Sequence, residues 1–522
     1  MELRAQKLAE LDGGHFDVLV IGGGINGAVT AAALAARDLR VALVERGDFA
    51  SFTSQQSSNL VWGGFKYLEN YELKLVWDLC TSRNHMLRSY PTQIKEIDFL
   101  ATLDQTAPFP LALAALGAVG YWGIGRFATK APRVYRASDI ESTEPLVDTS
   151  TAKGGIRYAD AYLPDNDARF VWGFVRSALD LGATAVNYVS VDRADRHDDR
   201  WTVSLTDTES GSPLRATATA IVNAAGPFID GLNEQLDLRT EHRIVYSKGI
   251  HLIVPKLTDS DRILAFFDDT GRLFYVIPMA NRSVVGTTDT RTDNPREGVL
   301  DADRDFLLEQ INARLDLDTP LTRSDIISER CGVRPLVVTR TGDDRTDTDW
   351  TSLSRKHEVE VDAAKKVVSI FGGKLTDCLN VGDEVAEALA EIGVIGGTPA
   401  PGWFGEPSES ERTRFYEAAA KRGLDRAPDI EVADTLAEVL WRRHGMATFD
   451  LLALIDRDPS LAEPALANSD VLVGELMLMA EREMIVHPDD FLRRRTKLAM
   501  VIRNDDLGAD PGMERVNEIF GF

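Results

Sequence analysis

FDVLVIGGGING, residues 16–27, is the stretch that decides the fold of this chain. Its first six residues are apolar almost throughout and include β-branched valines, as is typical of a short buried strand. Gly22, Gly24 and Gly27 then form a GxGxxG pattern. In such a turn the first glycine permits the tight bend, the second lets the backbone approach a pyrophosphate, and the third lets a helix pack against the strand. The stretch predicts the start of a dinucleotide-binding unit.

Three features downstream complete that unit. An alanine-rich helix is expected over residues 25–37, and RVALV, residues 40–44, reads as a second strand that ends at Glu45. The N-terminus of the helix offers unpaired N–H groups and a partial positive charge to phosphates. Glu45 lies 18 residues beyond Gly27, where an acid can accept hydrogen bonds from ribose hydroxyls. The whole unit predicts a bound dinucleotide, whereas a glycine-rich turn without a ligand is the simpler alternative.

Two later segments favour a flavin over a nicotinamide. IVNAAG, residues 221–226, reads as a strand that ends in a small-residue turn, as expected where a distant strand returns to cover the nucleotide. SIFGGKLTD, residues 369–377, is a second Gly-Gly turn that leads into a helix and could place N–H groups against a polar ring edge. It is not a phosphate-binding Walker sequence, because Leu375 follows the lysine where Ser or Thr is required.

Composition excludes several classes of function. The chain has 522 residues, enough for two or three domains, and a net charge of −24. That charge argues against nucleic acid as a partner, because the phosphates would be repelled. Three cysteines without a CxxC pair argue against a disulfide framework or a metal site and favour a reducing cytoplasm. No basic segment followed by an apolar one begins the chain, so no signal peptide is expected.

The order of several motifs identifies a family resemblance. The chain carries IGGGINGA, SSNLVWGGFKYLE, GPFID, KGIHLIVP, GTTD, CGVRPL, LSRKH and FGGKLTD in that order. In this it resembles the FAD-dependent, quinone-linked glycerol-3-phosphate dehydrogenases. The resemblance runs from about residue 15 to 400 and resumes near residues 481–500, so it covers most of the chain.

The resemblance implies an α/β (α+β) fold. A Rossmann-like FAD-binding domain of the glutathione-reductase/D-amino-acid-oxidase type is expected over residues 1–80, 150–240 and 325–395. An inserted substrate domain built on an antiparallel sheet would take residues 81–149 and 241–324. From residue 405 to 522 the spacing is helical, with Ser408 and Glu411 placed as a capping box, so we expect an all-α C-terminal domain.

The function implied is oxidation of sn-glycerol 3-phosphate to dihydroxyacetone phosphate by hydride transfer to FAD, with electrons passed to a quinone or another respiratory acceptor. One alternative is an FAD-dependent oxidase or dehydrogenase of another phosphorylated polyol, or of a small hydroxy or amino acid. An alternative of another class is a non-catalytic flavin-binding regulator. The oligomeric state stays open between a monomer and a homodimer.

The chemistry of the substrate and the resemblance together suggest the site residues. A phosphate dianion calls for several cations, and His251 has the residue type for accepting the hydroxyl proton or orienting the substrate. We expect a catalytic set of His251, Thr287, Arg334 and Lys374, and a substrate-binding set of Lys66, Tyr67, Arg334 and Arg355. The expected FAD-binding set is Gly22, Gly24, Gly27, Glu45, Ser54, Ser58, Val191, Ala225, Gly226, Gly373, Lys374, Leu375 and Thr376. For each cation or histidine alone, a structural ion pair or hydrogen bond is the simpler alternative.

Departures from the family pattern cluster in SSNLVWGGFKYLE. Asn59, Trp62 and Lys66 stand where the resemblance implies Lys, His and Arg. Two basic side chains are lost and one is weakened, because Lys lacks the bidentate fork of Arg. We therefore expect a less cationic substrate mouth.

One segment suggests a membrane contact. Residues 105–138 contain no Asp or Glu, although 82 of the 522 residues are acidic. Residues 107–125 carry no charge and hold aromatic side chains, and Arg126, Lys130, Arg133 and Arg136 follow. Such a pattern is typical of a segment that lies on an anionic leaflet without crossing it. The expected location is the cytoplasm, with peripheral contact to the inner face of the cell membrane as one hypothesis and a buried helix pair or loop as the other.

Overall fold

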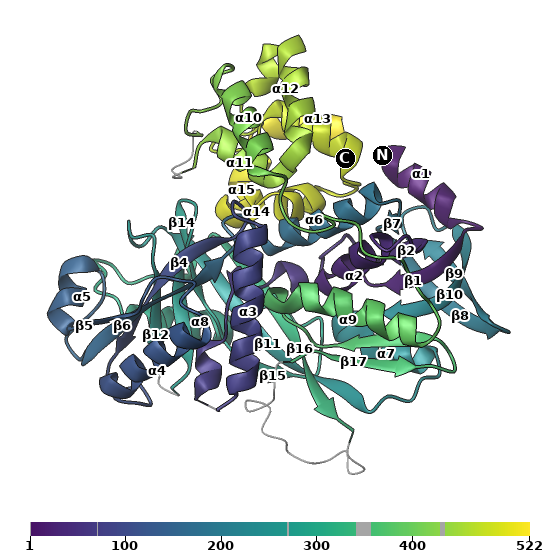
Figure 1. Ribbon diagram of the computed structural model, residues 1–522. Helices are drawn as coiled ribbons and strands as arrows, with labels where there is room; N and C mark the ends of the chain where they lie inside the picture. The colour runs from purple at the N-terminus through teal and green to yellow at the C-terminus, as the bar shows by residue number, and fades with distance from the viewer. Residues whose placement is uncertain (1, 70, 269–270, 341–355, 429–433) are drawn as a thin grey trace.

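The computed structural model describes all residues except 1, 70, 269–270, 341–355 and 429–433. Two sheets lie side by side, with a block of helices from the C-terminal part of the chain above them (Figure 1).

The nucleotide-binding unit is built on an eight-stranded sheet. Strand β1 (His15–Ile21) lies at its centre and pairs in parallel with β2 (Val41–Val44) and β10 (Pro213–Asn223). The other strands are β7 (Thr184–Val186), β8 (Val189–His197), β9 (Arg200–Asp207), β17 (Glu358–Asp362) and β18 (Val367–Phe371). The sequence prediction for the first strand, helix and second strand is confirmed to within two residues at each end.

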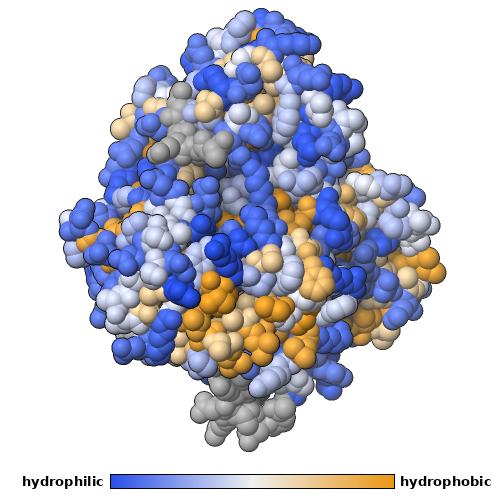
Figure 2. Space-filling view, turned by 60° about the vertical axis from the view of Figure 1, so that its left-hand side comes forward, coloured by the Kyte–Doolittle hydropathy of each residue, from blue (hydrophilic) through white to orange (hydrophobic). Residues whose placement is uncertain are grey.

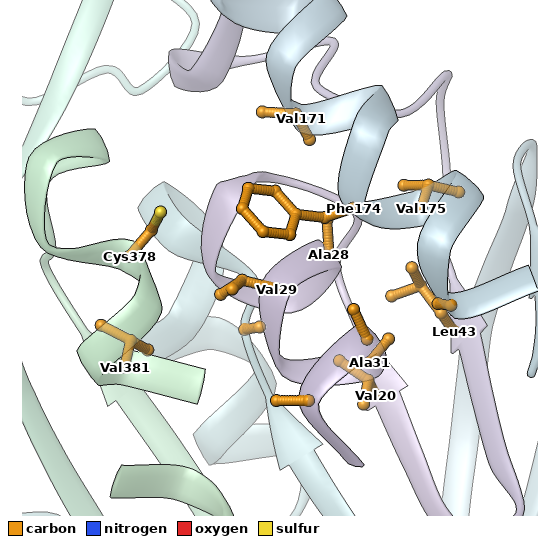
Figure 3. Packing of buried hydrophobic residues seen from close by; sticks show 14 of the residues in the cluster. Val20, Ala28, Val29, Ala31, Leu43, Val171, Phe174, Val175, Cys378 and Val381 are labelled. Atoms are coloured by element: carbon orange, nitrogen blue, oxygen red, sulfur yellow. The ribbon is translucent and has the colours of Figure 1, made fainter. Parts of the chain in front are cut away.

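Helix α2 (Ile25–Ala35) packs closely against this sheet. It lies between α6 (Asp167–Asp180) and α9 (Cys378–Glu391), as Figure 3 shows for Val29, Phe174 and Val381. Ten of its eleven residues are buried, which its alanines and glycine permit because small side chains let three layers approach one another. Gly27 leaves no room for a side chain, since an added Cβ would lie 1.8 Å from the carbonyl oxygen of Gly22.

The second sheet has ten strands and is mostly antiparallel. It comprises β3 (Leu60–Val61), β4 (Lys95–Leu103), β5 (Arg133–Tyr135), β6 (Gly154–Tyr162), β11 (His242–Pro255), β12 (Ile263–Phe267), β13 (Leu273–Met279), β14 (Arg282–Gly286), β15 (Thr290–Thr292) and β16 (Ser328–Thr339). The predicted fold class is confirmed. The domain limits stay a prediction. Those limits place β3, β6 and β16 in the FAD-binding domain, whereas all three strands pair within the second sheet.

The longest ladder of the second sheet sets the register of the site. Strands β11 and β16 pair over twelve residues, with Ser247 opposite Arg334 and His251 opposite Arg330. Residues 87 and 79 positions apart in the sequence are therefore neighbours in the sheet.

Helices cover both sheets. Those outside the C-terminal block and not yet named are α1 (Glu2–Leu11), α3 (Leu73–Ser89), α4 (Leu111–Ile124), α5 (Ala137–Thr143), α7 (Ile229–Gln235) and α8 (Asp301–Asn312). The C-terminal block contains α10 (Glu409–Ala420), α11 (Leu436–His444), α12 (Thr448–Arg457), α13 (Val473–Arg482), α14 (Leu498–Val501), α15 (Asn504–Ala509) and α16 (Gly512–Phe520). Ser408 caps α10 as predicted, because its hydroxyl accepts a hydrogen bond from the N–H of Glu411.

Candidate functional site

The first cavity lies where the central strands of the eight-stranded sheet end. It has a volume of about 550 Å³ and lies between the turn that opens α2, the end of β2 and the turn after β10. Its walls contain eight of the expected cofactor residues: Gly22, Gly24, Glu45, Ser54, Val191, Ala225, Gly226 and Gly373. Gly27 does not line the cavity; it allows α2 to pack closely against the turn at Gly22.

The backbone of this cavity suits a pyrophosphate. Gly22 has a φ of +106°, which only glycine adopts easily, and an added Cβ would lie 2.5 Å from the carbonyl oxygen of Ala224. At Gly24 an added Cβ would meet a single group, the hydroxyl of Ser54 at 3.1 Å. The N–H of Ile25 donates to that hydroxyl at 3.0 Å. Gly24 itself supplies no side-chain cap to α2, so the backbone at the start of this helix borders the cavity with only the hydroxyl of Ser54 against it.

Polar atoms in the wall also indicate a polar ligand. Asn26 Oδ1, Arg46 Nη2 and Ser51 Oγ are buried and have no hydrogen-bond partner among the described residues. All three residues border the cavity. Since a buried polar atom without a partner is costly, these atoms fit a bound group that carries its own donors and acceptors. The residues present therefore fit a dinucleotide.

Glu45 is fixed at the tip of β2. Its carboxylate accepts hydrogen bonds from the N–H groups of Gly23 at 2.7 Å and Gly47 at 2.9 Å. Burial raises the pKa of this carboxyl group, and the two backbone donors oppose that rise. The structure places Glu45 in the cavity wall. Its contact with a ribose stays a prediction.

A second cavity of about 380 Å³ adjoins the first. The two share Ile25, Thr53, Ser54, Pro335, Gly372 and Gly373. Besides the shared Ser54 and Gly373, nine of the expected residues border the second cavity: Ser58, Lys66, Tyr67, His251, Thr287, Arg334, Lys374, Leu375 and Thr376. Arg355 lies outside the described residues. Four members of the expected FAD-binding set, namely Ser58, Lys374, Leu375 and Thr376, border this cavity rather than the first.

Arg334 and Thr287 are brought together. The Nη2 of Arg334 donates to the hydroxyl of Thr287 at 3.0 Å, and its Nη1 lies 3.4 Å from Oδ1 of Asp289. The guanidinium lies over Gly249 of β11, where an added Cβ would be 2.1 Å from Nη2. Glycine at this position is therefore what leaves room for the arginine beside the cavity.

His251 borders the cavity but is only 1% exposed. Its Nε2 lies 2.8 Å from the hydroxyl of Ser58, and its Nδ1 is buried without a hydrogen-bond partner in the described part of the chain. The pKa of the imidazole is lowered well below its ordinary value, first by burial and then by the charges of Arg330 and Arg334. The ring is accordingly neutral at neutral pH.

Residues on both sides of the Gly63-Gly64 turn also line the cavity, namely Trp62, Lys66 and Tyr67. Lys374 Nζ lies 4.0 Å from the ring centroid of Tyr67, a cation–π contact, and the rings of Trp62 and Tyr67 are 5.7 Å apart. The hydroxyl of Thr376 donates to the carbonyl oxygen of Trp62 at 3.2 Å. These contacts join the FGGKLTD turn to the segment that carries Lys66.

Of the three residues that depart from the family pattern, only two line the second cavity. Trp62 and Lys66 border the second cavity, whereas Asn59 does not. Asn59 is buried, has a left-handed φ of +58°, and donates to the carbonyl oxygen of Asp165 at 2.8 Å. Asparagine tolerates that backbone conformation better than most residues. The expected loss of charge at the mouth therefore applies to positions 62 and 66 only.

The sequence did not single out several residues of the second cavity. Arg272 borders it and donates to the carbonyl oxygen of Asp289 at 2.6 Å, and Lys356, Glu72 and Asp289 itself also border it. Counting described residues, five cations and two acids line this cavity, in a chain whose net charge is −24. Such a local excess of positive charge is suited to a small anion.

Comparisons with known proteins agree with this geometry. Residues 17–352 match the family model "FAD dependent oxidoreductase", and residues 391–518 match "C-terminal domain of alpha-glycerophosphate oxidase". Glycerol-3-phosphate dehydrogenase 2 of Mycobacterium tuberculosis is 30% identical, over 95% of this chain and 83% of that protein. The aerobic glycerol-3-phosphate dehydrogenase of Bacillus subtilis is 30% identical, over 94% of this chain and 89% of that protein.

Solved structures show the same fold. The glycerol-3-phosphate dehydrogenase of Bacillus halodurans, complexed with FAD, superposes with a TM-score of 0.74 at 24% identity and covers 99% of this chain and 93% of its own. The L-alpha-glycerophosphate oxidase of Mycoplasma pneumoniae, with FAD bound, gives a TM-score of 0.57 at 17% identity over 75% of this chain and 98% of its own.

Proposed function

The chain belongs to the glycerol-3-phosphate dehydrogenase family of FAD-dependent oxidoreductases, and from that premise we propose that it oxidises sn-glycerol 3-phosphate to dihydroxyacetone phosphate with FAD as its cofactor. The observation that carries the proposal is the second cavity. It adjoins the dinucleotide cavity, is rich in cations, and is lined by Arg334, Thr287 and His251.

The residues of the chain have distinct tasks in this reaction. FAD, when bound, accepts the hydride that leaves the substrate carbon. Arg334 and Lys66 hold the phosphate, because charge-assisted hydrogen bonds to a dianion are the strong ones. His251, kept neutral by its surroundings, is able to accept the proton of the substrate hydroxyl. The start of α2 binds the pyrophosphate of the cofactor.

The second candidate function is oxidation of a related phosphorylated polyol. It is favoured by Trp62, which stands in the cavity wall where the resemblance implies a histidine.

The test of the proposed function is reduction of the flavin under anaerobic conditions. The purified, FAD-loaded protein should lose its yellow colour with glycerol 3-phosphate, and should keep it with glycerol, lactate or an amino acid. Faster bleaching by another polyol phosphate would identify that compound as the better substrate. Bleaching by none of these compounds would indicate a flavin-binding protein without this activity.

Arg334→Ala should weaken substrate binding far more than it changes flavin content. Loss of one charge-assisted partner of a phosphate costs about 1.5–3 kcal/mol, or roughly a tenfold to 150-fold loss of affinity. The measurement is the concentration of glycerol 3-phosphate that half-saturates anaerobic bleaching. Arg291→Ala, an exposed arginine on neighbouring β15, is the matched control. Equal half-saturation in Arg334→Ala and wild type would remove Arg334 from the phosphate site.

The electrons are proposed to leave to a quinone, and one surface of the molecule supports a membrane contact for that step. Helix α4 buries Ala114, Ala118 and Tyr121. Its other face exposes Leu113, Leu116 and Val119 to 55%, 69% and 54%. Figure 2 shows hydrophobic residues gathered on this side of the molecule. Helix α4 is therefore buried on one face only, and its exposed apolar face is the surface for which we propose a membrane contact.

Neighbouring residues extend this surface. Tyr71, Leu73 and Trp77 are exposed at the start of α3, which contacts α4, and Arg126 lies 4.8 Å from the ring of Trp77. Lys130, Arg133 and Arg136 are exposed beyond α4. Apolar side chains with adjoining cations suit an anionic leaflet. None of the described helices is long and apolar enough to cross a membrane.

Wild-type protein should co-sediment with anionic vesicles at low salt and less so at high salt. Leu116→Glu or Arg133→Glu should reduce the bound fraction, because each change removes apolar area or adds negative charge at the proposed surface. Ile395→Glu, a change at an exposed apolar residue far along the chain from this surface, should leave binding unchanged. A wild-type protein that stays in solution at low salt would favour a soluble electron carrier as the acceptor.

A further inference from the structure

His251 borders the second cavity but exposes almost none of its surface there. The imidazole is 1% exposed, and the one polar contact that its ring makes in the described structure is the hydroxyl of Ser58, 2.8 Å from Nε2. Ser58 itself borders the cavity. The polar path between the cavity and His251 therefore runs through the oxygen of Ser58.

The backbone on both sides of Ser58 is held firmly. The N–H of Ser57 donates to Asp167 at 2.7 Å, and the carbonyl oxygen of Ser57 accepts from Nη1 of Arg330 at 2.6 Å. The same Nη1 donates to the side chain of Asn59 at 2.9 Å. Arg330 lies opposite His251 in the β11–β16 ladder, so one buried guanidinium fixes the segment of Ser58 against the strand of His251. This arrangement is the preorganisation that a proton path requires.

We propose that Ser58 is a catalytic residue that carries the substrate proton to His251, an inference that rests on the proposed function. The substrate O–H bond breaks and its proton goes to Oγ of Ser58, while the proton of Ser58 goes to Nε2 of His251. The hydride leaves the same carbon for the oxidised FAD of the loaded enzyme, and the carbonyl bond of the product forms. Because a proton and a hydride both leave the substrate, the product carbonyl is neutral, and the positive charge of the protonated imidazole offsets the negative charge that the hydride delivers.

The charges around His251 fit this role. Burial lowers the pKa of the imidazole, and the charges of Arg330 and Arg334 lower it further. A phosphate dianion held at Arg334 offsets one of these charges, so His251 accepts a proton more readily when substrate is bound. Binding of the substrate phosphate is thus expected to raise the pKa of His251, the base that accepts the substrate proton.

The test compares Ser58→Ala, Ser58→Thr, His251→Ala and the double variant Ser58→Ala/His251→Ala in the FAD-loaded protein. Ser58→Ala should lower the rate of bleaching at saturating glycerol 3-phosphate by about 10²-fold, the effect of losing a proton-transfer group. Ser58→Thr, which keeps the hydroxyl, should retain most of the rate. The double variant should be no slower than the slower single one, because the two groups act as a unit. Ser283→Ala removes a buried hydroxyl on adjacent β14 that bonds to the N–H of Leu257, and should leave the rate unchanged.

The other outcomes have separate meanings. A loss under about threefold in Ser58→Ala, or multiplying losses in the double variant, would overturn the relay while leaving the proposed function intact. A colourless Ser58→Ala protein would return Ser58 to cofactor binding and also overturn the relay. Wild-type protein that glycerol 3-phosphate does not bleach would instead overturn the proposed function.

Discussion

His251→Ala should slow the reduction of the flavin by glycerol 3-phosphate by about 10²–10⁴-fold, the range for losing a general base. The reason is that the imidazole borders the cavity and has a lowered pKa, first through burial and then through the charges of Arg330 and Arg334, so that it is neutral and able to accept a proton. The half-saturating substrate concentration should change little, because the phosphate is held by other residues. Anaerobic stopped-flow bleaching separates the two quantities. His85→Ala, a change at an exposed histidine of α3, is the matched control.

The pH dependence gives a second measure of the same residue. A base whose pKa is lowered stays unprotonated to more acidic pH, so the acid limb of kcat/KM should fall below the ordinary histidine value of about 6.5. Arg330 and Arg334 are the charged groups that shift it. A loss of turnover under about threefold in His251→Ala would leave the histidine as a hydrogen-bonded residue of the sheet.

The parts of the fold that the sequence predicted well are local. The strand, turn and helix of residues 16–35 lie within one continuous stretch, and the glycines leave few other conformations for it. Glu45 was found because its distance from Gly27 follows from that unit. The capping of α10 by Ser408 likewise depends on residues three apart.

Features that depend on distant pairing were not accessible in this way. Arg330 reads in the sequence as one more strand residue, and only the register of β11 against β16 places it opposite His251. Asn59 reads as a lost cation of the substrate mouth, but its left-handed backbone and its bond to Asp165 turn it away from the cavity. The assignment of β6 and β16 to the second sheet depends on strand partners more than 50 residues away in the sequence.

The C-terminal helical block is fastened to the nucleotide-binding unit by a buried cluster of charges. Asp48, which follows β2, is 1% exposed. Its carboxylate accepts hydrogen bonds from Arg494 at 2.7 Å and from Arg495 at 2.8 and 2.9 Å. Asn187 adds a fourth bond at 2.9 Å. Both arginines belong to the short helical turn Asp490–Arg495, so Asp48 joins segments about 450 residues apart.

Asp48→Ala should lower the free energy of unfolding by about 3–5 kcal/mol, because it leaves two buried guanidinium groups without their shared carboxylate. Flavin retention should fall as well, since residues 50–54 beyond Asp48 form part of the wall of the cofactor cavity. Asp17→Ala is the control: its partner Arg40 is 58% exposed, and loss of such a surface pair should change the stability much less. Urea unfolding followed by both tryptophan and flavin fluorescence measures the two effects.

Acid should act on the same cluster. Burial raises the pKa of Asp48, but Arg495 and Arg494 outweigh it, so the pKa lies below its ordinary value. A carboxyl group with a lowered pKa contributes its stabilisation above the unfolded-state value of about 3.9, and this stabilisation is lost as the pH falls toward the folded-state value. The difference in stability between wild type and Asp48→Ala should therefore be constant near neutral pH and shrink only in strong acid. A difference that already disappears between pH 7 and 5 would show that the carboxylate is not held by the two arginines as the geometry indicates.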